Sequence, residues 1–219
     1  MAKSQRNHSY HESLWEGVPE GLAPSDARLR EAFLLERVAA ASERAGRSAR
    51  VLDVGCGEGH FAAALARAGA EVMAVDVAAE PLRRALVRAP DLDVRLVEPE
   101  GPLPFEDSSF DLVWAGEVIE HVADTSRWLS EVRRVLRSGG TLLLSAPDHG
   151  PLSRLRMGLS RSAFEAHFDP RSDHLRFYTR RVLADLLADF GFEDVAVVGA
   201  GGLPRARRVL LASGRRTRF

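Results

Sequence analysis

The sequence predicts an α/β fold in which helices cover both faces of a parallel sheet. Short apolar runs alternate with stretches of helical period through most of the chain, as is typical of repeated strand and helix units. A glycine-rich segment, residues 55–59, joins the first apolar run to an alanine-rich helical stretch. The 219 residues are 45% hydrophobic and 28% charged, which suits one domain with a large core.

The elements follow one another in a regular order. Residues 1–23 are polar and aromatic, and we expect an N-terminal arm there, followed by one domain over residues 24–219. Residues 25–46 have helical period and end at Gly46, a common helix stop. Apolar runs bounded by turn residues predict five strands, at residues 50–55, 71–76, 93–98, 110–116 and 141–147. The stretches between them predict helices at residues 61–70, 78–89 and 125–140.

Residues 147–178 break this rhythm, because histidines, aromatic residues and prolines occur there without a sustained core period. We expect an irregular insertion on the substrate side, since α/β proteins often build specificity after a strand's carboxyl end. The rhythm resumes with a helix at 179–192 and strands at 193–199 and 208–213. The link between these two strands is too short for a crossover helix, so they should pair antiparallel.

The amino-acid composition indicates which partners and which compartment to expect. A net charge of -1 and a pI near 6.7 give no reason to expect a nucleic acid partner. The single cysteine, Cys56, excludes an internal disulfide framework and suits a reducing compartment. We expect a cytoplasmic protein, because the N-terminal stretch lacks a long apolar region and no segment is long and apolar enough to span a bilayer.

The glycine segment, VLDVGCGEGHF, fits neither of two common nucleotide loops. A P-loop needs Lys and then Ser or Thr after its last glycine, but His60 and Phe61 follow Gly59. The dinucleotide fingerprint needs a small residue where His60 stands, and Asp53 would repel a pyrophosphate. A carboxylate at the end of this strand instead suits a ligand with positive charge.

S-adenosylmethionine is such a ligand, because it carries a sulfonium, an ammonium, a carboxylate and a ribose. Its cationic part can lie by Asp53, and its carboxylate can accept backbone N–H groups near the helix start after Glu58. Asp76 ends the second predicted strand, where a carboxylate can accept hydrogen bonds from both ribose hydroxyls.

These residues resemble a known family. DVGCGEG resembles motif I of the class I S-adenosylmethionine-dependent methyltransferases, and Asp76 resembles the acidic residue of motif II. LPFEDSSFDLVWAGEVIEHV and the segment at 134–147 resemble the ubiquinone and menaquinone biosynthesis branch (methyltransferase type 11), with Ser138 where that branch usually has proline. The resemblance is strong over residues 48–146 and looser over 174–213.

The resemblance implies a methyltransferase with a Rossmann-like three-layer sandwich and seven strands in the order 3-2-1-4-5-7-6, the last antiparallel. It assigns cofactor-binding positions to one set of residues: Asp53, Gly55, Cys56, Gly57, Gly59, Asp76, Val77 and Glu100. The branch usually has Asp near the adenine amino group where this chain has Pro99, so Glu98, Glu100 or a backbone carbonyl would replace it.

Glu117, Glu120 and His121 are the candidate catalytic residues, since their spacing puts them on one face if the segment is helical. His121 is a candidate general base, oriented by a glutamate. Alternatively, the three side chains would hold a divalent cation that lowers the acceptor's pKa, as the resemblance to ubiquinone-pathway enzymes suggests; we do not expect a metal. In a third interpretation, His121 is a packing residue beneath the cofactor.

We expect the residues that bind the methyl acceptor to come from the arm and the insertion. Tyr10 and Trp15 of the arm, with His149 and His174 of the insertion, are candidate substrate-binding residues, and the arm would act as a lid or pack on the surface. The predicted function is methyl transfer to a small molecule, with oxygen as the favoured acceptor atom. Transfer to nitrogen or carbon, and a non-catalytic domain that only binds the cofactor, are the alternatives.

Overall fold

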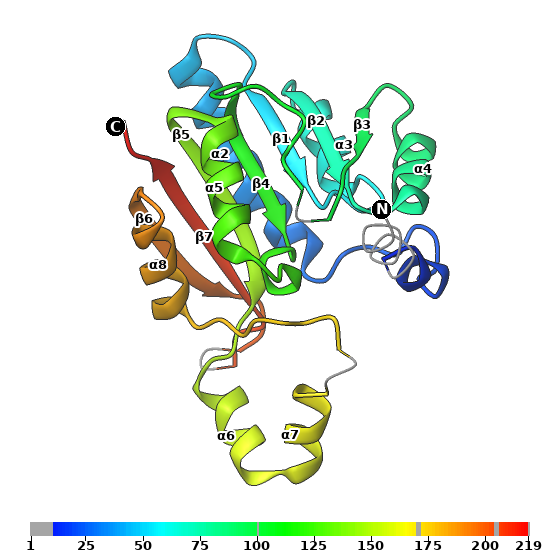
Figure 1. Cartoon of the computed structure of the whole chain (residues 1–219), viewed down its shortest axis with the longest axis vertical. Helices are drawn as coiled ribbons and strands as arrows, with labels where there is room; N and C mark the ends of the chain where they lie inside the picture. Colours follow the sequence, from blue (N-terminus) through cyan, green and yellow to red (C-terminus); the bar gives the residue numbers. More distant parts are fainter. Residues whose placement is uncertain (1–10, 100, 170–171, 204–205, 219) are drawn as a thin grey trace.

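The structure is a three-layer α/β sandwich built on one seven-stranded sheet (Figure 1). The computed structural model describes residues 11–99, 101–169, 172–203 and 206–218. The strands, in chain order, are β1 (Arg50–Val54), β2 (Glu71–Asp76), β3 (Asp93–Leu96), β4 (Phe110–Gly116), β5 (Leu136–Pro147), β6 (Phe192–Ala200) and β7 (Val209–Arg216). Their spatial order is β3-β2-β1-β4-β5-β7-β6. Strands β1 to β5 pair in parallel, whereas β7 is antiparallel to β5 and β6, which confirms the predicted fold class.

Of the seven described α-helices from residue 27 onward, five flank the sheet where the sequence predicted them and two lie in the insertion. Their bounds are α2 (Ala27–Ala45), α3 (His60–Arg67), α4 (Ala79–Arg88), α5 (Thr125–Val135), α6 (Pro151–Leu159), α7 (Arg161–His167) and α8 (Arg180–Asp189), with the short 3-10 helix η1 (Ile119–His121) after β4. Helix α2 ends at Gly46, whose φ of 63° lies in the left-handed region that glycine adopts without strain. Residues 11–16 of the arm are also helical.

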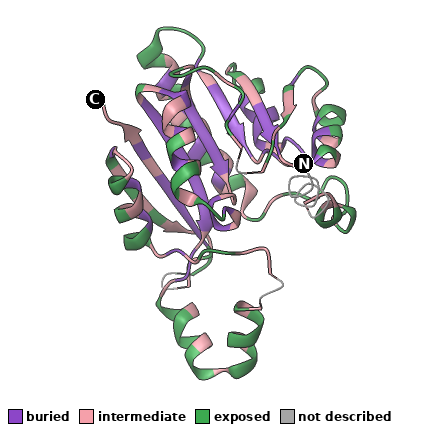
Figure 2. Cartoon of the chain, viewed as in Figure 1, coloured by how far each residue is buried: buried purple, intermediate pink, exposed green. Residues whose placement is uncertain are grey.

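Alternate residues of the central strands feed two apolar layers, so both faces of the sheet are buried (Figure 2). On one face, Val51 and Leu112 pack with Leu34 of α2 and Leu65 of α3. On the other face, Leu52 and its neighbours pack with side chains of α5 and α8. Because both faces are covered, ligand sites are expected at the sheet's edge, outside the carboxyl ends of the parallel strands.

Several element bounds differ from the prediction by a few residues, and two differences are larger. The helix expected to continue to residue 140 ends at Val135, because the chain turns at Gly139 (φ 73°) and Leu136 already pairs with Phe110 of β4. The insertion, expected to be irregular, contains helices α6 and α7. None of the residues 151–167, all of which the structure describes, is buried, so no core period marked these helices in the sequence.

Within the described residues, no helix is long and apolar enough to cross a bilayer.

Candidate functional site

The glycine loop after β1 lies where the carboxyl ends of β1, β2 and β4 meet. The backbone N–H groups of Gly55 and Cys56 donate to the carbonyl of Val75 at 2.8 and 3.0 Å. All three loop glycines have positive φ, at 68°, 52° and 69°. At Gly59, an added Cβ would also fall 2.9 Å from the Cβ of Ala85, so the loop approaches α4 too closely for a side chain.

Asp76, at the end of β2, ties the glycine loop to the turn before α4. Its Oδ2 accepts a hydrogen bond from the N–H of Gly57 at 2.9 Å, and its Oδ1 accepts one from the N–H of Ala78 at 3.0 Å. Burial raises the pKa of Asp76, and these backbone donors oppose that shift. The carboxylate therefore has a structural task, and its remaining lone pairs can accept from a ligand hydroxyl.

Asp53, in β1, is the most unusual carboxyl group of the loop region. Only 1% of the residue is exposed, and Oδ2 has no hydrogen-bond partner among the described residues. The N–H of Ala62 donates to the same carboxyl group. Burial, together with the charge of Asp76, raises the pKa of Asp53 to about 8, while Arg30 acts in the opposite direction. A cation placed at Oδ2 would satisfy this atom and favour its ionised form.

Arg30, from α2, is a buried cation that the sequence analysis did not single out. It is 2% exposed, and its guanidinium lies over the rings of Phe61 and Trp114, 4.8 and 5.8 Å from their centroids. A Cβ at Gly116 would fall 2.5 Å from its Nη2, so this glycine makes room for the side chain. Burial lowers the pKa of Arg30, although the charges of Glu117, Glu120 and Asp53 oppose the shift. Its Nε has no partner among the described residues.

The predicted helical face of Glu117, Glu120 and His121 does not form. Glu117 precedes η1 and has a φ of 59°, and its Oε1 accepts from the hydroxyl of Ser145 at 3.0 Å. Glu120 and His121 lie in η1, where Glu120 is fully buried without a partner for either carboxylate oxygen among the described residues. Burial, with a further contribution from the charge of Glu117, raises the pKa of Glu120 to about 8.

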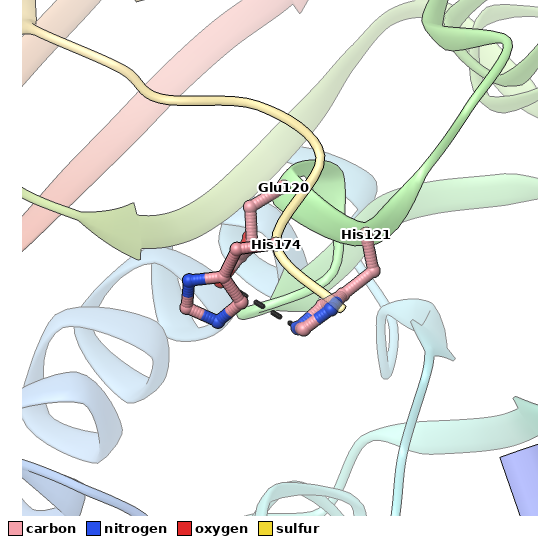
Figure 3. Close-up of side chains that lie close together, drawn as sticks. All are labelled: Glu120, His121 and His174. Atoms are coloured by element: carbon pink, nitrogen blue, oxygen red, sulfur yellow. Dashed lines mark ion pairs between the residues drawn. The ribbon is translucent and has the colours of Figure 1, made fainter. Parts of the chain in front are cut away.

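His121 instead contacts the end of the insertion (Figure 3). Its Nδ1 lies 3.1 Å from the carbonyl oxygen of Asp173 and 3.4 Å from a carboxylate oxygen of the same residue. The His121 ring packs edge-on against His174 at 4.8 Å, and its Nε2 lies 4.0 Å from Glu120. Burial lowers the pKa of His121, although the charge of Asp173 opposes the shift.

The group of side chains that would hold a metal therefore differs from the predicted one. Glu120, His121 and His174 offer ligand atoms within 4.8 Å of one another, and Glu117 is replaced by a histidine from the insertion. His174 could be singled out in the sequence because it lies in an insertion that contains histidines. Its contact with His121 could not be predicted, because it depends on how the insertion packs against η1.

His149, another candidate substrate residue, lies buried at the base of the insertion. Its Nδ1 is 3.2 Å from the carbonyl oxygen of Tyr178, and its ring contacts His167 and Phe177 at 4.8 and 5.3 Å. Burial lowers its pKa. These contacts anchor the insertion to the body of the protein, and a role of His149 in substrate binding stays a prediction.

The N-terminal arm lies over the glycine loop and α4. The carboxylate of Glu12 accepts hydrogen bonds from the backbone N–H groups of Ala79 and Glu80 at the start of α4. The indole of Trp15 reaches Gly57, where an added Cβ would lie 3.1 Å from the ring. Arg84 of α4 donates hydrogen bonds to the carbonyl of Trp15 in the arm and to the carboxylate of Glu58 in the glycine loop, and so joins the arm to both. The predicted site residues Tyr10 and Glu100 lie outside the described residues.

The sheet order, the glycine loop and the carboxylates after β1 and β2 together define the class I methyltransferase fold. A family model described as a methyltransferase domain matches residues 27–197. Because this match spans more than half of the chain, the chain belongs to the methyltransferase domain family.

Similar sequences support the assignment to this family. The chain is 34% identical over 185 residues to a ubiquinone biosynthesis O-methyltransferase of Xanthomonas axonopodis pv. citri, covering 82% of this chain and 76% of the relative. It is 35% identical over 161 residues to a Mycobacterium tuberculosis protein named a probable S-adenosylmethionine-dependent methyltransferase, covering 72% of this chain and 53% of that relative. The match thus spans about half the length of the mycobacterial protein.

Solved structures share the fold at lower identity. The CurJ carbon methyltransferase has a TM-score of 0.68 at 20% identity, and covers 87% of this chain and 55% of its own. An S-adenosylmethionine-dependent methyltransferase from Methanosarcina mazei has a TM-score of 0.60 at 24% identity, and covers 78% of this chain and 93% of its own.

Proposed function

We propose that this protein methylates an oxygen atom of a small-molecule acceptor, with His121 as the general base. The observation that carries the proposal is the orientation of His121. Its Nδ1 faces the carbonyl of Asp173 at 3.1 Å, so Nδ1 carries the proton and Nε2 is left as the acceptor. Because burial lowers its pKa, the ring is neutral at pH 7 and can accept a proton from a hydroxyl group.

The residues around the glycine loop fit S-adenosylmethionine, which supplies a methyl group on a positively charged sulfur when bound. The unpartnered Oδ2 of Asp53 suits the cationic part of the cofactor. Asp76 would accept hydrogen bonds from the ribose hydroxyls while keeping its two backbone donors. Arg30, with a free Nε in the described structure, would offset the negative charge that these carboxylates bring together.

The acceptor would lie between His121 and the cofactor, covered by the insertion and the arm. His174 packs against His121 and limits the position of its ring. Trp15 would cover the cofactor side and exclude water, because the arm is fixed to α4 through Glu12 and Arg84. Methyl transfer is an in-line displacement, so alignment and exclusion of water are the main tasks left to the protein.

A metal-assisted version of the same reaction is the second candidate. The ligand atoms of Glu120, His121 and His174 are close enough to bind one ion, which would lower the pKa of the acceptor hydroxyl. The raised pKa of Glu120 opposes this version at neutral pH, since a ligand carboxyl must lose its proton first.

The test is formation of S-adenosylhomocysteine with panels of phenol, sugar, amine and carbon-acid acceptors, before and after treatment with EDTA. We expect turnover with hydroxyl acceptors that survives EDTA. His121→Gln should lower kcat by about 100-fold or more and remove the acidic limb of the pH profile, whereas the control His167→Gln should not. Turnover only with amines or carbon acids would contradict oxygen as the acceptor, and loss of activity with EDTA would favour the metal.

A further inference from the structure

The α6–α7 hairpin, residues 151–167, stands away from the sandwich at the end of the molecule (Figure 1). Every residue of these two helices is described, and none is buried; the hairpin is almost entirely exposed in Figure 2. Its exposed apolar side chains are large, and they are Leu152, Leu155, Leu159 and Phe164. An exposed apolar patch of this kind indicates a binding surface.

The apolar residues of α6 share one side of the helix. Leu152, Leu155 and Leu159 are spaced i, i+3 and i+7, and Leu159 is 80% exposed. Helices of nine and seven residues are too short to be stable alone in water, where about 12 to 15 residues are marginal. Packing on the apolar side stabilises such helices, yet in the described structure the three leucines of that side are 50%, 55% and 80% exposed.

The charge of the hairpin indicates what covers this side. Residues 151–167 contain three arginines, at positions 154, 156 and 161, and one acidic residue, Glu165, which gives a net charge of about +2. Glu165 is already paired with Arg161 at 2.7 Å. Two copies of a basic hairpin would repel each other, whereas an anionic surface would attract it.

The hairpin also forms an open hollow of about 390 Å³. Arg156, Ser160, Ser162 and His167 line it together with two alanines, and the hydroxyl groups of Ser160 and Ser162 lie 3.1 Å apart. The Nε2 atom of His167 is buried without a hydrogen-bond partner among the described residues. These groups are the donors that a phosphate group requires.

We propose that the α6–α7 hairpin docks this protein on anionic phospholipid membranes, with its leucines in the interface and phosphate headgroups at its arginines and hollow. Leucine on one side with arginine nearby is the pattern of segments that lie in the membrane interface. The insertion that carries the hairpin also carries His174, whose ring packs against His121, so docking would bring the acceptor side toward the lipid surface. The proposed membrane-binding surface of the hairpin is independent of which atom accepts the methyl group.

Vesicle co-sedimentation of the full chain tests the proposal. We expect binding to vesicles that contain phosphatidylglycerol, little binding to phosphatidylcholine alone, and weaker binding at high salt. Leu159→Glu should weaken binding by about tenfold or more, because it removes a large apolar side chain and adds a negative charge. The double variant Arg154→Ser and Arg156→Ser should remove the preference for anionic lipid.

Val87→Glu is the matched control, because Val87 on α4 is 74% exposed and lies outside the hairpin. Its binding should equal that of the wild type, and circular dichroism should show that each variant is folded. Absence of wild-type binding to phosphatidylglycerol vesicles, or an equal loss in Val87→Glu, would overturn the proposal. A dimer in solution that Leu159→Glu dissociates, without vesicle binding, would assign the hairpin to a second copy instead.

Discussion

We expect Asp53 to make cofactor binding depend on pH. Its Oδ2 is buried without a partner among the described residues, and its pKa is raised to about 8. If the cationic part of S-adenosylmethionine lies at this oxygen, Asp53 must be ionised in the complex. Below pH 8, binding therefore has to release a proton from Asp53, and this proton release weakens the observed affinity.

The size of the effect follows from the pKa. With a value of about 8, about one molecule in ten has Asp53 ionised at pH 7, and about one in a hundred at pH 6. The association constant should therefore rise about 50-fold from pH 6 to pH 8 and level off near pH 9 at about 100-fold above its pH 6 value, a total change of about 2.7 kcal/mol. Asp53→Asn keeps an acceptor for the Ala62 N–H but cannot ionise, so it should lack this rise.

Isothermal titration calorimetry of wild type and Asp53→Asn from pH 6 to pH 9 measures this directly. The ligand's own amine also titrates, and its effect on affinity is the same for both proteins. Dividing the wild-type affinity by that of Asp53→Asn therefore removes this effect. Two buffers with different heats of ionisation would count the released proton. A ratio that stays constant over this range would refute the assignment of Asp53 to the cationic part of the cofactor.

Stability should change with pH in the opposite sense. An Asp53 with a raised pKa keeps a proton in the folded state that the unfolded chain loses near pH 4. The free energy of unfolding of the cofactor-free protein should therefore fall as the pH rises from about 4 to about 8. Added cofactor should raise the melting temperature more at pH 8 than at pH 6.

Three further changes test neighbouring parts of the site. Arg30→Met removes the buried cation near Asp53 and should weaken cofactor binding by about tenfold or more in calorimetry; unchanged affinity would exclude Arg30 from the site. Gly59→Ala combines a φ of 69° with a Cβ 2.9 Å from that of Ala85 and should cost about 2 to 4 kcal/mol in urea unfolding, whereas Gly46→Ala, which meets no neighbour, should cost about 1. Glu12→Gln weakens two hydrogen bonds that fix the arm and should speed proteolytic cleavage near residue 17; equal cleavage rates would contradict the docked arm.

The sequence predicted the sheet well because its strands are buried on both faces and bounded by turn residues. The run 110–116 became β4 without a shift in either end. Helices α6 and α7 could not be predicted in the same way, because they bury no residue and are too short, at nine and seven residues, to show a sustained apolar period. The prediction of an insertion at this place rested on the loss of period itself.

The candidate site was predictable where local rules act. The glycines with positive φ and the acidic residue after β2 are recognisable from their neighbours in the chain. Arg30 was missed because an arginine in an amphipathic helix reads as a solvent-exposed residue, and its burial depends on Phe61 and Trp114 from other elements. Glu117 left the expected face because its left-handed backbone precedes the 3-10 turn.

The central claim, that the glycine loop and Asp76 hold S-adenosylmethionine, is tested most directly by calorimetry of wild type and Asp76→Ala. The ligands are S-adenosylmethionine, S-adenosylhomocysteine and NAD, and exposed Asp91→Ala is the matched control. Because Asp76 also anchors Gly57, thermal unfolding without ligand must show that the variant is folded. The account predicts micromolar binding of the first two ligands, weakened about tenfold or more by Asp76→Ala alone. Binding of NAD instead, or an affinity unchanged in Asp76→Ala, would contradict it.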